Sequence, residues 1–209
     1  KSTLSMRLNN SNSRNLFWLR SWGEMIFKRS VQYIIDSTLC TACEGCTGIC
    51  PVSAISMVRN TADYLLANID PEICIDCGKC LEICPSVQAN TPNIICADLF
   101  HGNYLAGYIG HASDGKIRLI SQSGGIVTAL LCYLLETGSI DGAIVNKFDT
   151  TNKRPVASYE DSINGIKKGA GSYYVQSSVV EEILKYKDKR TAAVILGCQG
   201  ESINLISKR

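Results

Sequence analysis

A cysteine pattern that occurs twice between residues 40 and 85 constrains this chain more than any other feature. The first copy consists of Cys40, Cys43, Cys46 and Cys50, followed by Pro51, and the second of Cys74, Cys77, Cys80 and Cys84, followed by Pro85. Each cysteine recurs 34 positions later, and Ile35-Asp36 matches Ile69-Asp70 at the same offset. We therefore predict two copies of one supersecondary unit, related by a pseudo-twofold axis.

The spacing of these cysteines also indicates what they bind. The 209 residues include eleven cysteines, and residues 1 to 30 lack the continuous apolar core of a secretory signal, so disulfides of an oxidising compartment have no support. A zinc ribbon needs two pairs of ligands separated by a loop, whereas this chain has runs of four that end in proline. Three thiolates spaced three residues apart suit one face of a cuboidal iron–sulfur cluster, whose fourth ligand comes from elsewhere in the chain.

All eight positions resemble the motifs of bacterial ferredoxins that carry two [4Fe-4S] clusters. In that family each motif supplies three ligands to one cluster and its fourth cysteine to the other. The resemblance implies that cluster 1 is bound by Cys40, Cys43, Cys46 and Cys84, and cluster 2 by Cys74, Cys77, Cys80 and Cys50. Gly45, Gly48 and Gly78 would let backbone amides approach the sulfurs. We expect an electron-transfer domain with an α+β ferredoxin-like fold between about residues 31 and 95.

Residues 1 to 30 form a basic extension, with six Lys or Arg side chains against Glu24 alone. A segment of this kind could be a nucleic-acid arm, an organelle transit peptide or a partner-docking segment. We favour docking or disorder and predict no nucleic-acid partner. No stretch of the chain reaches the roughly 18 apolar residues of a membrane-spanning helix, so we predict no transmembrane segment.

Beyond a boundary between about residues 95 and 103, alternating strand and helix patterns predict an α/β domain over residues 104–209. Apolar residues at helical spacing predict a helix from Ile126 to a stop at Gly138. We also expect a strand over 140–148, a helix around 181–186 and a buried strand over 191–196. The loop from Ser121 to Gly125 offers backbone amides at a helix N-terminus that suit a phosphate, although it is equally an ordinary helix start.

Three cysteines lie outside the two motifs. We interpret Cys96 and Cys132 as small buried residues that pack against apolar neighbours. Cys198 follows the predicted strand, at a turn into a helix. The helix terminus could lower the pKa of its thiol and make it a thiolate or a ligand. The alternative is that Cys198 is a buried turn residue.

Three segments of this second half occur in series: Ser121 to Leu131, reading SQSGGIVTALL; Gly169 to Val175, reading GAGSYYV; and Cys198-Gln199 followed by Glu201. Together they resemble the N-terminal part of the coenzyme F420 hydrogenase/dehydrogenase beta-subunit family. The sequence departs from that family at two positions, with Tyr173 in the place of a lysine and Gly197 in the place of a proline. The resemblance covers roughly residues 104 to 209, and many family members carry a ferredoxin module before it.

The resemblance implies a flavin-binding domain that holds FAD. The flavin site would be lined by Ser123, Gly124, Gly125, Gly171, Ser172 and Tyr174, with Cys198 and Gln199 near it. Catalysis would belong to the flavin, and no catalytic side chain is identified. Because family members continue beyond the Cys-Gln segment, we expect the domain to be incomplete at its C-terminus or completed by another polypeptide.

The leading hypothesis is an iron–sulfur flavoprotein oxidoreductase, or a subunit of one. It would pass electrons between a reduced coenzyme such as F420, via FAD, and the two clusters, with further redox proteins as partners. The alternative is a flavin-free electron-transfer subunit of a larger complex. We expect a cytoplasmic location, or an organelle matrix if residues 1 to 30 are a targeting remnant.

Overall fold

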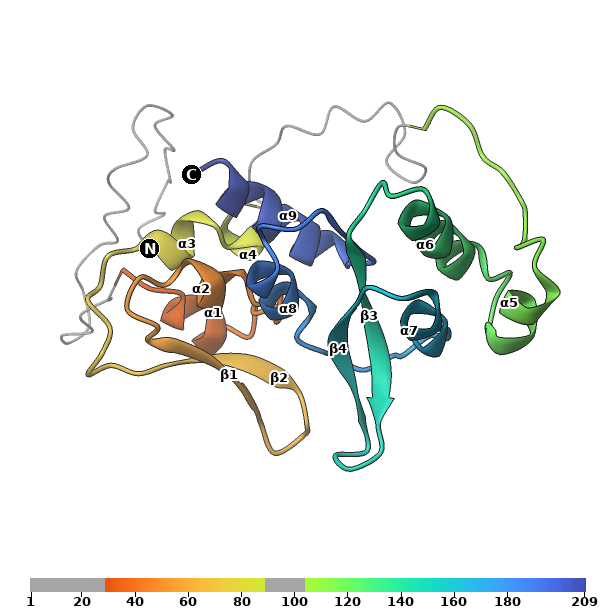
Figure 1. Ribbon diagram of the computed structural model, residues 1–209. Coiled ribbons are helices and arrows are strands. Elements are labelled where there is room, and N and C mark those ends of the chain that lie inside the picture. Colours follow the sequence, from red (N-terminus) through yellow and green to blue (C-terminus); the bar gives the residue numbers. More distant parts are fainter. Residues whose placement is uncertain (1–28, 89–103) are drawn as a thin grey trace, which may run out of the picture.

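The computed structural model describes residues 29–88 and 104–209, which form a mixed α+β fold (Figure 1). Most of the predicted basic extension, the end of the predicted first domain and Cys96 lie outside the described residues. Within the described ranges, no helix has both the length and the apolar character that crossing a membrane requires.

The cysteine-rich part of the chain consists of short helices around one β-hairpin. Its elements are α1 (Gln32–Asp36), α2 (Gly45–Ile49), β1 (Ile55–Arg59), β2 (Leu65–Ile69), α3 (Lys79–Glu82) and α4 (Pro85–Gln88). Strands β1 and β2 pair antiparallel, with Ile55 opposite Ile69. The hairpin lies between the two cysteine motifs in the sequence and therefore joins their loops within one unit.

The backbone of this part repeats at the same offset as the cysteines. Ala42 and Asp76, the matching residues of the two copies, both have a left-handed backbone with a φ of 54°. Glu44 and Gly78 are left-handed as well, with φ of 66° and 78°, and they directly precede α2 and α3. The predicted repeat is therefore present in the structure, and its left-handed residues bend each motif into a tight loop before a helix.

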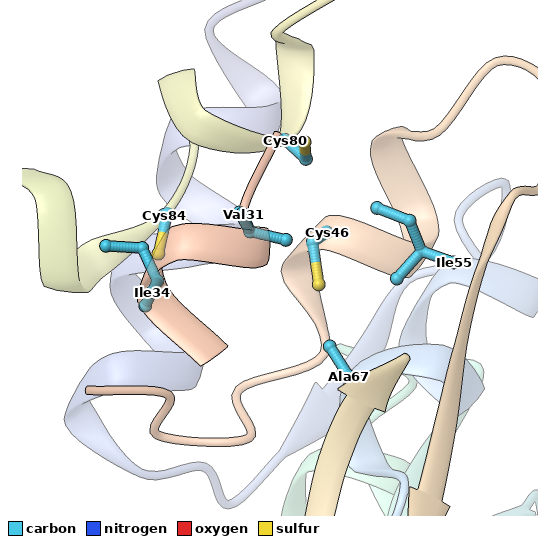
Figure 2. Close-up of a cluster of buried hydrophobic side chains, with 7 residues drawn as sticks. All are labelled: Val31, Ile34, Cys46, Ile55, Ala67, Cys80 and Cys84. Atoms are coloured by element: carbon cyan, nitrogen blue, oxygen red, sulfur yellow. The ribbon is translucent and has the colours of Figure 1, made fainter. Parts of the chain in front are cut away.

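Cysteine side chains form much of the core of this part. Figure 2 shows the buried cluster, which consists of Val31, Ile34, Cys46, Ile55, Ala67, Cys80 and Cys84. A domain of this size buries few apolar side chains, and here thiols occupy central positions of the core. These cysteines therefore contribute to the packing of the core in addition to being candidate cluster ligands.

The second part of the chain is a small mixed sheet with helices on both sides. Its elements are α5 (Gly115–Ile120), α6 (Ile126–Glu136), β3 (Gly142–Asp149), β4 (Arg154–Glu160), α7 (Ile163–Lys168), α8 (Val179–Lys185), β5 (Thr191–Ala193) and α9 (Gly197–Ser207). The strand order is β4-β3-β5, with β3 antiparallel to β4 and parallel to β5. Figure 1 shows α6 and α7 on one side of this sheet and α8 and α9 on the other.

The prediction of the long helix is confirmed, since α6 begins at Ile126 and the chain leaves it through Gly138, which has a φ of 67°. Cys132 is buried in the core beside Ala143, as predicted. The prediction of a buried strand over 191–196 is wrong: β5 ends at Ala193, and Val194 and Leu196 are exposed. In the described part of the chain β5 pairs with β3 alone, so it is an edge strand without the second neighbour that a buried strand has.

Helices α8 and α9 connect the two parts of the molecule. Both helices pack on α2, and α9 also packs on α4. An ion pair between Arg209 and Glu82 joins the end of α9 to α3. In Figure 1 these two helices accordingly lie between the cysteine-rich part and the sheet.

Candidate metal centre

Four cysteines line one small cavity in the cysteine-rich part. They are Cys40, Cys43, Cys46 and Cys84, and the remaining lining includes the apolar residues Val31, Ile34 and Ile83. This is the set that the ferredoxin resemblance assigns to cluster 1, and it combines three cysteines of the first motif with the last cysteine of the second. The lining also includes Thr41 and Glu44 but is mainly sulfur and apolar carbon. Such a lining suits an iron–sulfur cluster, which is bound by thiolates and sheltered from water.

The other four cysteines differ widely in exposure. Cys80 is buried, Cys50 and Cys74 are half-buried, and Cys77 is exposed. The sulfur of Cys50 accepts a hydrogen bond from the backbone N–H of Ala54 at 3.2 Å. An N–H donor to a thiolate is the kind of neighbour that stabilises the negative charge of a cluster.

None of the ten cysteines in the described ranges takes part in a disulfide. In the same ranges, no three His, Cys, Asp or Glu side chains come close enough together to hold a single metal ion. A [4Fe-4S] cluster does not require such a meeting point, because each cysteine binds a different iron.

Burial raises the pKa of the Cys46 thiol, and the neighbouring Cys43 and Cys40 raise it further. Burial also raises the pKa values of Cys43 and Cys80, while hydrogen bonds from backbone N–H groups, such as that of Gly45 to Cys43, oppose the change. Without metal these thiols are therefore protonated at neutral pH. Binding of iron must displace their protons, so cluster assembly is coupled to proton release.

The residue that sequence reasoning missed is Glu44, which lies between two cysteines of the first motif. Its side chain is 1% exposed, and Oε2 accepts hydrogen bonds from the backbone N–H groups of Val180 at 3.1 Å and Glu181 at 3.3 Å. The cluster 1 loop is thereby fixed to the first turn of α8. A charged residue inside so tight a motif was the only available signal, because its partners lie about 136 positions away in the sequence.

Gln176 makes a second connection between the two parts. Its side-chain oxygen accepts a hydrogen bond from the backbone N–H of Leu65 at 2.8 Å, and its backbone carbonyl accepts one from the Arg59 guanidinium at 3.0 Å. The hairpin is thus tied to the segment that leads into α8. The sequence offered no signal for this contact.

Two of the three predicted flavin-site segments lie side by side. The side-chain oxygen of Gln122 accepts a hydrogen bond from the backbone N–H of Ser172 at 3.0 Å, which joins the loop before α6 to the segment around Gly171. Gly125 has a φ of 73° and directly precedes α6, so its left-handed backbone sets the entry of the chain into that helix. Ser123 and Ser172 are exposed, and Tyr174 is 93% exposed.

The third segment faces the cysteine-rich part. The side-chain oxygen of Gln199 accepts a hydrogen bond from the backbone N–H of Leu196 at 2.9 Å, so this buried amide caps its own helix. Among the effects that raise the pKa of the Cys43 thiol, Cys198 contributes after burial and Cys84. Cys198 lies in the first turn of α9, the helix that packs on α2.

A larger cavity lies between the hairpin and the β4–α8 region and is lined by Arg59 of β1, Arg154 of β4, and Glu181 and Lys185 of α8. None of the eight predicted flavin-site residues lines this cavity or the cysteine-lined one. The Gln122–Ser172 contact, which joins two of the segments predicted to line a flavin site, therefore lies outside both of these cavities.

Comparison with known families finds a match in each part of the chain. Residues 39–87 match the model of the 4Fe-4S dicluster domain, and residues 108–185 match that of the coenzyme F420 hydrogenase/dehydrogenase beta subunit, N-terminal domain. The matches indicate an iron–sulfur polypeptide. Its two regions are similar, in this order, to a 4Fe-4S dicluster domain and to the N-terminal domain of the coenzyme F420 hydrogenase/dehydrogenase beta subunit, as the sequence resemblance predicted.

Individual relatives agree with this assignment. The chain is 30% identical over 177 residues to the coenzyme F420-dependent sulfite reductase of Methanocaldococcus jannaschii, covering 83% of this chain and 26% of that protein. It is 26% identical over 182 residues to one of the subunits of the F420H2 dehydrogenase of Methanosarcina mazei, covering 83% of this chain and 50% of that protein. This chain therefore spans half or less of the length of these relatives.

Among solved structures, the chain is similar to one chain in a xenon-derivatised F420-reducing [NiFe] hydrogenase complex from Methanosarcina barkeri. The TM-score is 0.42 with 28% sequence identity, and the match covers 48% of this chain and 38% of the other.

Proposed function

We propose that this chain passes electrons between a two-electron coenzyme of the F420 type and two [4Fe-4S] clusters, with FAD as the carrier between them. The observation that carries the proposal is the cavity lined by Cys40, Cys43, Cys46 and Cys84, which combines cysteines from both motifs. The relatives named for F420-dependent reactions support the coenzyme. FAD would accept an electron pair and release single electrons to the clusters.

In this proposal cluster 1 is held by Cys40, Cys43, Cys46 and Cys84, and cluster 2 by Cys74, Cys77, Cys80 and Cys50. The cysteine-lined cavity supports the first set. The backbone repeat of the two loops supports the second set, because Asp76 and Gly78 give the second loop the same turn as the first. The chain's own role is to bind the clusters at fixed positions and to keep water away from the inner one.

The flavin would lie against the loop from Ser123 to Gly125 and the segment Gly171, Ser172 and Tyr174, with Cys198 and Gln199 nearby. The hydrogen bond between Gln122 and Ser172 supports this site, since it joins two of the three segments. The N-terminus of α6 would face the flavin's phosphates, where bare N–H groups and the helix dipole favour negative charge. We place the chain in the cytoplasm, in association with other redox subunits.

A second function is favoured by one observation: the flavin-site residues line neither of the two cavities, and Tyr174 is almost fully exposed. In this version the chain carries only the clusters, and another polypeptide supplies the flavin. The exposed loop would then be a docking surface for that polypeptide.

Flavin content and coenzyme oxidation distinguish the two functions. The chain is purified anaerobically, its FAD is quantified, and reduced F420 is added while cluster absorption is followed. Bleaching of the clusters at a rate that depends on bound FAD supports the first function. The second function would be supported if the purified chain contains clusters but no FAD, and if dithionite bleaches these clusters whereas reduced F420 does not.

A matched pair of variants links the bleaching to the clusters. Cys77→Ser removes a proposed cluster 2 ligand, whereas Cys132→Ser changes a buried cysteine outside both motifs. The first should lose about half of the iron, and the second should keep all of it. Equal iron in both variants would refute the ligand assignment.

A further inference from the structure

The two clusters of the proposed function have different surroundings. Helix α9, which belongs to the second part of the chain, packs on α2 and α4, and these helices carry or directly follow cluster 1 ligands. The cluster 2 loop is more open, since Cys77 is exposed and its neighbours Ile73 and Ile75 are 47% and 60% exposed. The second part thus packs on the cluster 1 loop, and it also reaches α3 through the ion pair between Arg209 and Glu82.

Ser202 is a residue of α9 that lies against this loop. It is fully buried, and a Cβ atom added to Gly45 would lie 2.6 Å from its Cβ and 2.9 Å from its Oγ. The backbones of α2 and α9 therefore approach each other closely at this point, and the absence of a side chain at Gly45 makes the approach possible. The Ser202 hydroxyl consequently lies over the turn that carries Cys43 and Cys46.

The hydroxyl of Ser202 donates a hydrogen bond to the backbone carbonyl of Gln199 at 2.9 Å. Ser202 also lowers the pKa of the Cys43 thiol, against the larger effect of burial. When Cys43 binds iron, its sulfur is a thiolate, which is the stronger acceptor. The Gln199 carbonyl belongs to the helix ladder and can do without the hydroxyl.

We propose that Ser202 donates a hydrogen bond to the Cys43 sulfur of cluster 1 and raises the reduction potential of that cluster relative to cluster 2. A cluster that accepts one electron gains one negative charge, part of which lies on its sulfurs. A hydrogen-bond donor therefore stabilises the reduced form more than the oxidised form. Through α9, the second part of the chain sets the potential of the cluster closest to it.

The inference rests on the proposed function, because it requires that Cys43 ligates a cluster. Ser202 is a positioning residue, since it acts on the cluster through a ligand and exchanges no electron itself. Its hydroxyl can be deleted with little disturbance, because Ser202→Ala introduces no new atoms beside Gly45.

Ser207 provides a matched control on the same helix. Its hydroxyl donates to the Asn204 carbonyl at 3.0 Å, which repeats the local bond between Ser202 and Gln199, but Ser207 is exposed and lies at the end of α9. Ser202→Ala and Ser207→Ala therefore delete the same kind of intrahelical hydrogen bond. They differ because Ser202 faces the loop that carries a proposed cluster ligand, whereas Ser207 is exposed.

The test is a redox titration of the full chain, followed by electron paramagnetic resonance, in two backgrounds. Cys77→Ser leaves cluster 1 to be observed, and Cys43→Ser leaves cluster 2. We expect Ser202→Ala to lower the midpoint potential in the first background and to leave it unchanged in the second, with Ser207→Ala unchanged in both.

An unchanged potential in the Cys77→Ser background would overturn the inference, and so would an equal shift in both backgrounds. Two clusters per chain with no response to Ser202→Ala would leave the proposed function intact and refute the inference alone. A chain that binds no iron at all would overturn both.

Discussion

Glu44 offers a sensitive test of how the two parts of the molecule are joined. Its left-handed backbone is unfavourable for a residue with a side chain, and the matching residue of the second copy is Gly78. Such a conformation costs roughly 1–3 kcal/mol and persists only where other contacts outweigh it. The hydrogen bonds from the N–H groups of Val180 and Glu181 are those contacts.

Glu44→Ala removes the acceptor and keeps the strained backbone. The N–H of Val180, which belongs to a fully buried residue, then loses its partner at a cost of about 1–3 kcal/mol, whereas the N–H of the exposed Glu181 can reach water. We expect a loss of about 2 kcal/mol, which for a chain of this size lowers the thermal midpoint by about 4–8 °C. Glu44→Gln retains an acceptor and should lower it by less than half as much.

Glu44→Gly separates strain from hydrogen bonding. It removes the acceptor as Ala does, but it relieves the left-handed backbone, so its midpoint should lie about 2–4 °C above that of Glu44→Ala. Thermal unfolding of the anaerobic, cluster-loaded chain at one scan rate measures all three variants, with the exposed Glu72→Ala as a control. A midpoint for Glu44→Ala equal to that of the wild type, or a lower one for Gly than for Ala, would contradict this explanation of the Glu44 contact.

Three further predictions concern packing, charge and metal. Gly45→Ala should destabilise the chain by about 1–3 kcal/mol through overpacking against Ser202, whereas Gly115→Ala, with open space around it, should not; thermal unfolding of both variants measures the difference. The Arg190 side chain lowers the pKa of Asp141 by hydrogen bonding, so their pair stabilises the fold above the ordinary pKa of an aspartate. The midpoint difference between wild type and Asp141→Asn should therefore shrink as the pH falls through that value toward the lowered pKa, and a constant difference would contradict the pairing. Removal of iron by a chelator should lower the thermal midpoint, because Cys46, Cys80 and Cys84 form part of the core, and reconstitution with iron and sulfide should restore it; a midpoint indifferent to iron would argue against a structural role for the clusters.

The sequence predicted most of what depends on local spacing. The repeat, the two tight loops and the helix from Ile126 follow from cysteine intervals, glycines and a helical period, all of which act over a few residues. Local spacing does not predict how deeply a strand is buried. The apolar run from Ala192 to Leu196 predicted burial, but whether an apolar strand is central or at an edge depends on which strands pair beside it.

The candidate site shows the same division. The cysteine set of the inner cavity was predictable because the ferredoxin pattern fixes it. The packing of the first cysteine loop against α8 and α9 was not predictable. Glu44 binds N–H groups of residues about 136 positions away, and Ser202 meets Gly45 only because the two helices pack closely. The missing side chain of Gly48 leaves room for the side chain of Leu184 in α8, a role that the sequence did not indicate. Tertiary packing, rather than the motif itself, decided these roles.

The proposed electron relay requires two [4Fe-4S] clusters in one chain. Iron and acid-labile sulfide should be quantified per chain after anaerobic purification, and the reduced protein examined by electron paramagnetic resonance. We predict about eight irons and eight sulfides, with the signal of two interacting clusters. About four irons, or zinc in place of iron and sulfide, would contradict the relay.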